Sequence, residues 1–113
     1  MEWITVCASE ELEDGLGVTA LVNHRQVALF RTAGELFAVD NYDPFSKANV
    51  LSRGIVGDIQ GRLVVASPVY KQHFDLETGE CLEDGSVSID THRIREHHGM
   101  LQIALISETC QVA

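Results

Sequence analysis

The stretch that decides the fold covers residues 40–75 and carries two short proline-containing loops. The first loop reads NYDPF (residues 41–45), and the second reads ASPVY (residues 66–70). Between the loops, residues 55–66 contain two apolar runs on either side of Gly61. Two runs of β-forming residues separated by a glycine turn predict a hairpin. The chain is therefore expected to leave the first loop, form a hairpin and enter the second loop.

Short segments rich in β-forming residues fill most of the remaining chain. The expected strands and extended segments cover residues 3–7, 19–22, 26–32, 35–40, 55–60, 62–66, 73–76, 86–89, 93–96 and 100–105. Turn residues recur between them at close intervals, which favours an antiparallel β-sandwich or barrel. No apolar stripe of helical period is present, so helix content should be low. We predict a single all-β domain over residues 1–106, followed by a flexible tail at 107–113.

Composition limits the classes of function. The 113 residues suit one domain, and 17 Asp and Glu against 8 Lys and Arg give a formal net charge of −9. This acidic balance argues against nucleic acid and against an anionic membrane surface as partners. The N-terminus does not read as a signal peptide, and no apolar run approaches the roughly 20 residues of a membrane span. The three scattered cysteines, Cys7, Cys81 and Cys110, favour a reducing cytoplasm and no disulfide.

The order of the two loops resembles the cluster-binding half of a Rieske ferredoxin domain. In that family a Cys-Pro-His loop and a Cys-Pro-x-His loop hold a [2Fe-2S] cluster through two thiolates and two imidazoles. The resemblance assigns these four ligand positions, in chain order, to Asp43, Phe45, Ser67 and Tyr70. Both loop prolines, Pro44 and Pro68, are retained. Residues 39–82 would then be a former cluster-binding subdomain within an all-β, Rieske-like domain.

The four residues at these positions are poor ligands for a cluster of this type. A phenyl ring cannot ligate iron, and Asp, Ser and Tyr are a weak set for iron already bound to sulfide. The loops are therefore expected to persist without a metal site, and no cofactor is expected on this chain.

Further strings narrow the resemblance within the Rieske-like group. They are VLSRG (residues 50–54), KQHF (residues 71–74) and GECLED (residues 79–84). Together with the two loops they look like the small subunit of bacterial NAD(P)H-dependent nitrite reductase, in those members that have lost the cluster ligands. The resemblance covers nearly the whole chain.

This resemblance implies an accessory role in a cytoplasmic enzyme that reduces nitrite to ammonium. The large subunit of such an enzyme carries FAD, a [4Fe-4S] cluster and sirohaem, and it would be the partner of this chain. No catalytic residue is expected here, because the chain has no phosphate-cradling glycine motif and no base in either loop that would activate Ser67.

Two readings of the aromatic residues Phe45 and Tyr70 stay open. Both rings could fill the space that a cluster would occupy. Alternatively, the loop tips could form a docking surface, since aromatic anchors inside a polar rim are typical of such surfaces. The residues of this candidate docking surface are Asp43, Pro44, Phe45, Ser67, Pro68 and Tyr70. In the docking reading, Asp43 and Ser67 would belong to the rim.

Two rival functions also stay open: a Rieske-type ferredoxin that carries electrons through an unconventional metal site, and a freestanding protein-binding module. Two further groups deserve a structural check. His73 and Asp75 would share one face of a strand, although an ordinary surface pair is the better interpretation. His97 and His98 read as part of a polar hairpin turn rather than as a metal site.

Overall fold

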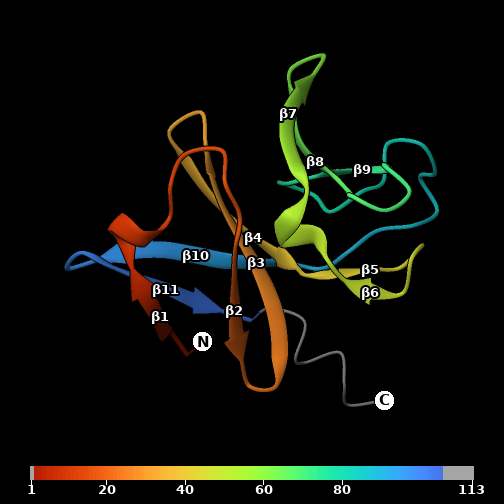
Figure 1. Cartoon of the computed structure of the whole chain (residues 1–113). Helices are drawn as coiled ribbons and strands as arrows, with labels where there is room; N and C mark the ends of the chain where they lie inside the picture. The colour runs from red at the N-terminus through yellow and green to blue at the C-terminus, as the bar shows by residue number, and fades with distance from the viewer. Residues whose placement is uncertain (1, 106–113) are drawn as a thin grey trace.

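The computed structural model describes residues 2–105 and consists mainly of antiparallel β-strands (Figure 1). The strands are β1 (Ile4–Ala8), β2 (Val18–Val22), β3 (Arg25–Thr32), β4 (Glu35–Asp40), β5 (Tyr42–Asp43), β6 (Ala48–Asn49), β7 (Ile55–Ile59), β8 (Arg62–Ala66), β9 (His73–Asp75), β10 (Thr91–His97) and β11 (Met100–Ala104). Two 3₁₀ turns, η1 (Ser9–Glu11) and η2 (Leu51–Arg53), interrupt them. Over residues 2–105, no helix is long and apolar enough to cross a membrane.

The strands form one large sheet and two small ones. The large sheet has the order β1-β11-β10-β4-β3-β2, and its edge strands β1 and β2 lie near one another, so the sheet is nearly closed. The second sheet pairs β5 with β6, and the third has the order β7-β8-β9. Figure 1 shows both small sheets on one side of the large sheet, with the β7–β8 hairpin projecting away from it. The predicted all-β fold class is confirmed.

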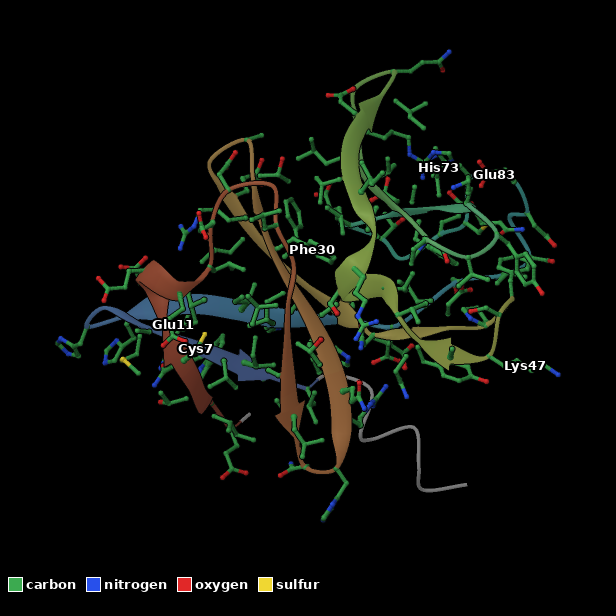
Figure 2. All side chains as sticks on the ribbon, viewed as in Figure 1. Cys7, Glu11, Phe30, Lys47, His73 and Glu83 are labelled. Atoms are coloured by element: carbon green, nitrogen blue, oxygen red, sulfur yellow. The ribbon has the colours of Figure 1, made fainter. Side chains whose placement is uncertain are left out.

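Strand β3 lies between two hydrophobic cores, so its residues are buried on both faces. Val27 and Leu29 pack into a core inside the curved large sheet. Ala28 and Phe30 point the opposite way, into a core shared with the small sheets. Alternation of side chains along a strand produces this division. The second core packs the part of the chain that carries both loops (residues 41–74, here called the loop-bearing side) against the large sheet. Phe30 lies between the large sheet and this side in Figure 2.

The expected hairpins form, and their turns have the conformation that their residues favour. At the β7–β8 turn, Gln60 and Gly61 have φ angles of 52° and 86°. Two consecutive left-handed residues make the mirror-image turn whose twist matches antiparallel strands. The pairs Asn23–His24, Ala33–Gly34 and His98–Gly99 repeat the pattern at the other hairpins of the large sheet. The strand predictions around these turns are confirmed to within two residues.

Other segments differ from the sequence-based expectation. Residues 86–89 were expected to be extended, but they make only one isolated bridge, Glu80 with Ser88. The polar segment after β1 contains η1 and then the buried Leu12. Strands β5 and β6 and the turn η2 were not anticipated, because side-chain hydrogen bonds rather than periodicity produce them.

Some predictions from the sequence lie beyond what the structure tests. The proposed limits of the domain (1–106) and of the former cluster-binding subdomain (39–82) stay predictions. The tail at 107–113 and Cys110 lie outside the described residues. Cys7 and Cys81 are both free thiols, and burial raises the pKa of each.

Candidate functional site

Asp43 organises the first loop from the inside. Its side chain is fully buried and accepts hydrogen bonds from the backbone N–H of Phe45 at 2.9 Å and the hydroxyl of Ser46 at 2.9 Å. The bond to the residue two positions on is an Asx turn, and Pro44 between them supplies a preset φ. The backbone N–H of Lys47 also bonds the Asp43 carbonyl at 2.7 Å. The sequence DPFS therefore folds into a closed turn around one carboxylate.

Ser67 performs the same task in the second loop. Its hydroxyl oxygen lies 3.3 Å from the backbone N–H of Val69, so each loop has a side-chain oxygen that accepts from two residues on across a proline. Ser67 also donates its hydroxyl proton to the Oδ2 atom of Asp43 over 2.5 Å. Both side chains are buried. The two loops are thus joined by one short hydrogen bond between the positions that the resemblance assigns to the two cysteines.

Asn41 holds the start of the first loop against the rest of the domain. It is buried, and its side-chain oxygen accepts from the backbone N–H of Ser52 at 2.7 Å. Its side-chain nitrogen donates to the Gln26 side chain at 3.0 Å, and its carbonyl accepts from the Leu51 N–H at 3.1 Å. One amide side chain thereby links β3, the first loop and η2. Its backbone N–H also donates to the Gln26 carbonyl at 3.0 Å, and these four satisfied groups on a buried Asn fix the loop geometry.

Phe45 lies against the interior. Its ring is partly buried and packs against the core shared with the small sheets, with its centroid 6.1 Å from that of Phe74 at an interplanar angle of 45°. This separation is within the range for favourable aromatic pairs. Pro44 beside it is also partly buried. The first loop therefore directs its aromatic ring inward.

Tyr70 lies in the opposite situation. Its side chain is 61% exposed, and the neighbouring Pro68 and Val69 are exposed as well. The expectation that both rings fill the space of a cluster is wrong for Tyr70, because its ring faces solvent. The expectation that Asp43 and Ser67 form an exposed rim is also wrong, because both are buried and bonded to each other.

The residues present do not fit a [2Fe-2S] cluster of the Rieske type. Such a cluster needs two thiolates and two imidazoles, whereas the aligned positions hold a carboxylate, a phenyl ring, a hydroxyl and a phenol. The carboxylate and the hydroxyl already satisfy each other. Within residues 2–105, no three His, Cys, Asp or Glu side chains are grouped so that they could hold a metal ion.

His73 and Asp75 have separate partners and do not form an acid–base pair. His73 Nδ1 lies 2.6 Å from Glu83 Oε2, and Figure 2 shows the two residues next to one another. The His73 backbone N–H also donates to Glu83 at 2.8 Å. Burial acts to raise the pKa of Glu83, but the hydrogen bonds from His73 outweigh it and lower the pKa. Asp75 instead accepts from Arg62 at 2.8 Å. The interpretation as an ordinary surface pair is therefore wrong in two respects, because the two residues pair with other side chains and Asp75 is buried.

Comparison with known proteins decides the family. A family model for the Rieske-like [2Fe-2S] domain matches residues 2–104. The nitrite reductase (NADH) small subunit of Salmonella typhimurium is 41% identical over 104 residues, which is 90% of this chain and 96% of that protein. The chain belongs to the Rieske-like domain family and, within it, to the nitrite reductase (NADH) small subunits. The family resemblance read from the sequence is confirmed.

Two further relatives bear on the site. The solution structure of the NAD(P)H nitrite reductase small subunit from Erwinia carotovora is 45% identical, covers 92% of this chain and 82% of that chain, and superposes with a TM-score of 0.77. A Klebsiella oxytoca protein named as the large subunit of NAD(P)H nitrite reductase is 35% identical over 101 residues. The match takes in 89% of this chain but 11% of that protein.

Sequence reasoning found the two loops but not the hydrogen bond between them. Asp-Pro-x-Ser is a recognisable signal for a side chain that caps its own turn, and Ser-Pro-x is a weaker one. Neither signal tells which oxygen faces the other loop, because residues 43 and 67 meet only through the β7–β8 hairpin and the core beneath it.

Proposed function

We propose that this chain is the accessory small subunit of a cytoplasmic NAD(P)H-dependent nitrite reductase, which reduces nitrite to ammonium. It carries no catalytic residue and no cofactor. Its partner is the large subunit, which holds the FAD, the [4Fe-4S] cluster and the sirohaem. The chain docks on that partner through the tips of the two loops.

The match to the Klebsiella oxytoca large subunit carries the proposal. A segment similar to nearly all of this chain forms a small part of that longer protein. A domain that is covalently joined to the catalytic chain in one organism has its contact surface within one molecule. The same domain on a separate chain must form that contact between molecules. Docking on the large subunit is therefore the simplest role for a free copy.

The loop geometry supports docking rather than electron transfer. The aligned ligand positions lack every thiolate and imidazole that a Rieske cluster requires. The loops nevertheless keep both prolines and are held by a buried hydrogen bond. Tyr70, Pro68 and Val69 project from this rigid base into solvent. An exposed aromatic side chain on a well-fixed loop is a suitable anchor for a protein interface.

Titration of the purified chain against the large subunit from the same organism tests the proposal. We expect a stoichiometric complex, and we expect nitrite reduction by the large subunit to rise or to become stable when the complex forms. Absence of binding would overturn the proposal and favour a freestanding binding module.

Iron reconstitution tests the rival role of electron carrier. The chain should show no visible absorption after incubation with iron and sulfide, whereas a cluster-binding Rieske ferredoxin treated in parallel should. A stoichiometric [2Fe-2S] spectrum on this chain would overturn the view that it is an accessory subunit without a cluster.

A further inference from the structure

The stretch that carries both loops, residues 41–74, has a positive formal charge in this acidic protein, although the adjoining residues 75–90 hold six Asp and Glu and no Lys or Arg. Residues 41–74 contain four Lys and Arg against two Asp, a formal charge of +2. The rest of the chain has four Lys and Arg against 15 Asp and Glu, a formal charge of −11. Of the two Asp in this stretch, Asp43 is buried and Asp58 caps the β7–β8 turn through the Gly61 N–H at 2.8 Å. Neither Asp of this stretch forms an ion pair among the described residues.

Three of these cations have no carboxylate partner among the residues that the structure describes. Arg62 forms ion pairs with Asp75 at 2.8 Å and with Glu80 at 2.9 Å. No ion pair within residues 2–105 involves Lys47, Arg53 or Lys71. All three side chains are exposed, and Figure 2 shows Lys47 at the far end of the β5–β6 hairpin.

Two of the unpaired cations flank a surface hollow of about 290 Å³ at the base of the second loop. Arg53 and Lys71 line it, together with an apolar floor of Ile55, Ala66 and Pro68. Ile55 is 77% exposed, so its side chain is accessible to a partner at the hollow. His73 also lines the hollow, but it is already paired with Glu83.

We infer that this hollow receives an acidic segment of the large subunit that carries an apolar side chain. The apolar side chain seats on Ile55 and Pro68, and its neighbouring carboxylates lie between Arg53 and Lys71. The inference rests on the proposed function and specifies the partner's chemistry at the same surface. Two observations carry it: Arg53 and Lys71 are exposed with no carboxylate partner among the described residues, and exposed apolar side chains lie between them. Charge complementarity of this kind speeds association and fixes orientation.

Charge reversal at the hollow tests the inference. The combined Arg53→Glu and Lys71→Glu variant is titrated against the intact large subunit at low and at high salt. We expect the affinity to fall about tenfold or more at low salt, with a weaker salt dependence than that of the unmodified chain. Arg93→Glu is the matched control, because Arg93 is an exposed cation on β10 with no ion pair among the described residues.

A second pair of variants tests the apolar floor. Ile55→Ala should weaken binding about fivefold, since a side chain in the centre of an interface is costly to truncate. Leu21→Ala is the control, because Leu21 is 70% exposed on β2, outside the loop-bearing side. Urea unfolding of all four variants shows that they fold like the unmodified chain. All five substituted positions are exposed, so little change in stability is expected.

The outcomes separate this inference from the proposed function. If the unmodified chain does not bind the large subunit, both fall. If it binds and the hollow variants match their controls, the docking role survives and this inference is overturned. If sedimentation instead shows a homodimer that the Arg53→Glu and Lys71→Glu variant dissolves, with no effect on the large subunit, the hollow belongs to a second copy and the inference is also overturned.

Discussion

The two loops have nearly the same local construction and opposite surroundings. Each places a proline after a residue whose side-chain oxygen accepts a hydrogen bond from two positions on. The first loop then turns the ring of Phe45 onto Phe74 in the core. The second loop leaves Tyr70 61% exposed. The same kind of side-chain hydrogen bond across a proline therefore determines the shape of each loop, but it does not determine the direction in which the aromatic residue points.

This difference separates a packing task from a binding task within one site. In cluster-binding relatives of the fold, a metal cluster joins the two loops. In this chain the Asp43–Ser67 hydrogen bond joins them, so the link between the loops is conserved in effect while its chemistry is different. The first loop, whose aromatic ring faces the core, should therefore govern stability. The second loop, whose aromatic ring faces solvent, should govern recognition.

The largest expected effect comes from breaking the link between the loops. Asp43→Ala removes the acceptor of three donors: the hydroxyls of Ser46 and Ser67 and the N–H of Phe45. Buried groups left without a partner cost about 1–3 kcal/mol each, and water can reach part of this site, so we expect a loss of about 3 kcal/mol. The free energy of unfolding in urea measures it.

A double-mutant cycle gives the control for this prediction. Ser67→Ala alone should cost about 1 kcal/mol, and the combined Asp43→Ala and Ser67→Ala variant should cost clearly less than the sum of the single changes. Strict additivity would mean that the two loops do not depend on their shared hydrogen bond, and the comparison with a cluster-linked site would fail.

The next effect tests the inward position of the first aromatic ring. Phe45→Ala should lower the free energy of unfolding by about 2 kcal/mol, less than the 3–5 kcal/mol typical of a fully buried ring because Phe45 is only partly buried. Phe45→Leu, which keeps most of the contact with Phe74, should cost about half as much. A loss below about 0.5 kcal/mol for Phe45→Ala would remove the distinction between the loops.

The buried carboxylate of Asp75, at the end of β9, offers a smaller effect that depends on pH. Burial acts to raise the pKa of Asp75, but hydrogen bonds from Arg62 and from the N–H groups of Thr78 and Glu77 outweigh it and lower the pKa. Its contribution, about 1 kcal/mol, is therefore present above the usual Asp pKa of about 3.9 and is lost as pH falls through the lowered value.

Urea unfolding between pH 5 and pH 2.5 measures this contribution. Asp75→Asn should be less stable than the unmodified chain at pH 5, and the gap should narrow as the pH falls. Asp58→Asn, at an exposed hairpin turn, is the control. A gap that widens in acid would contradict the sign of the shift.

The fold could be predicted from the sequence to a useful degree because its signals are local. Alternating strands and glycine-containing hairpin turns are set by neighbouring residues, so nine of the expected strands correspond to strands of the structure. The short strands β5 and β6 could not be predicted this way. They flank the first loop, next to Asn41, whose side chain bonds to residues in β3 and η2 that lie far from it in sequence.

The site was harder to predict than the fold for the same reason. The positions of Asp43 and Ser67 followed from the loop pattern, but their burial and mutual bond follow from how the hairpin stacks one loop on the other. The exposure of Tyr70 was also undetermined, since an aromatic residue in a loop carries no signal of direction. The hollow near Ile55 combines residues from three segments, and only the folded arrangement brings them together.

The smallest expected change in stability is the most informative about function. Tyr70→Ala should alter the free energy of unfolding by less than about 0.5 kcal/mol, because the ring is mostly exposed. The same change should weaken binding to the large subunit by ~2 kcal/mol, roughly thirtyfold, if the ring is an interface anchor. Tyr70→Phe separates the ring from its hydroxyl and should bind nearly as well as tyrosine. A large loss of stability with unchanged affinity would make Tyr70 a packing residue like Phe45, and the docking surface would then lie away from the loop tips.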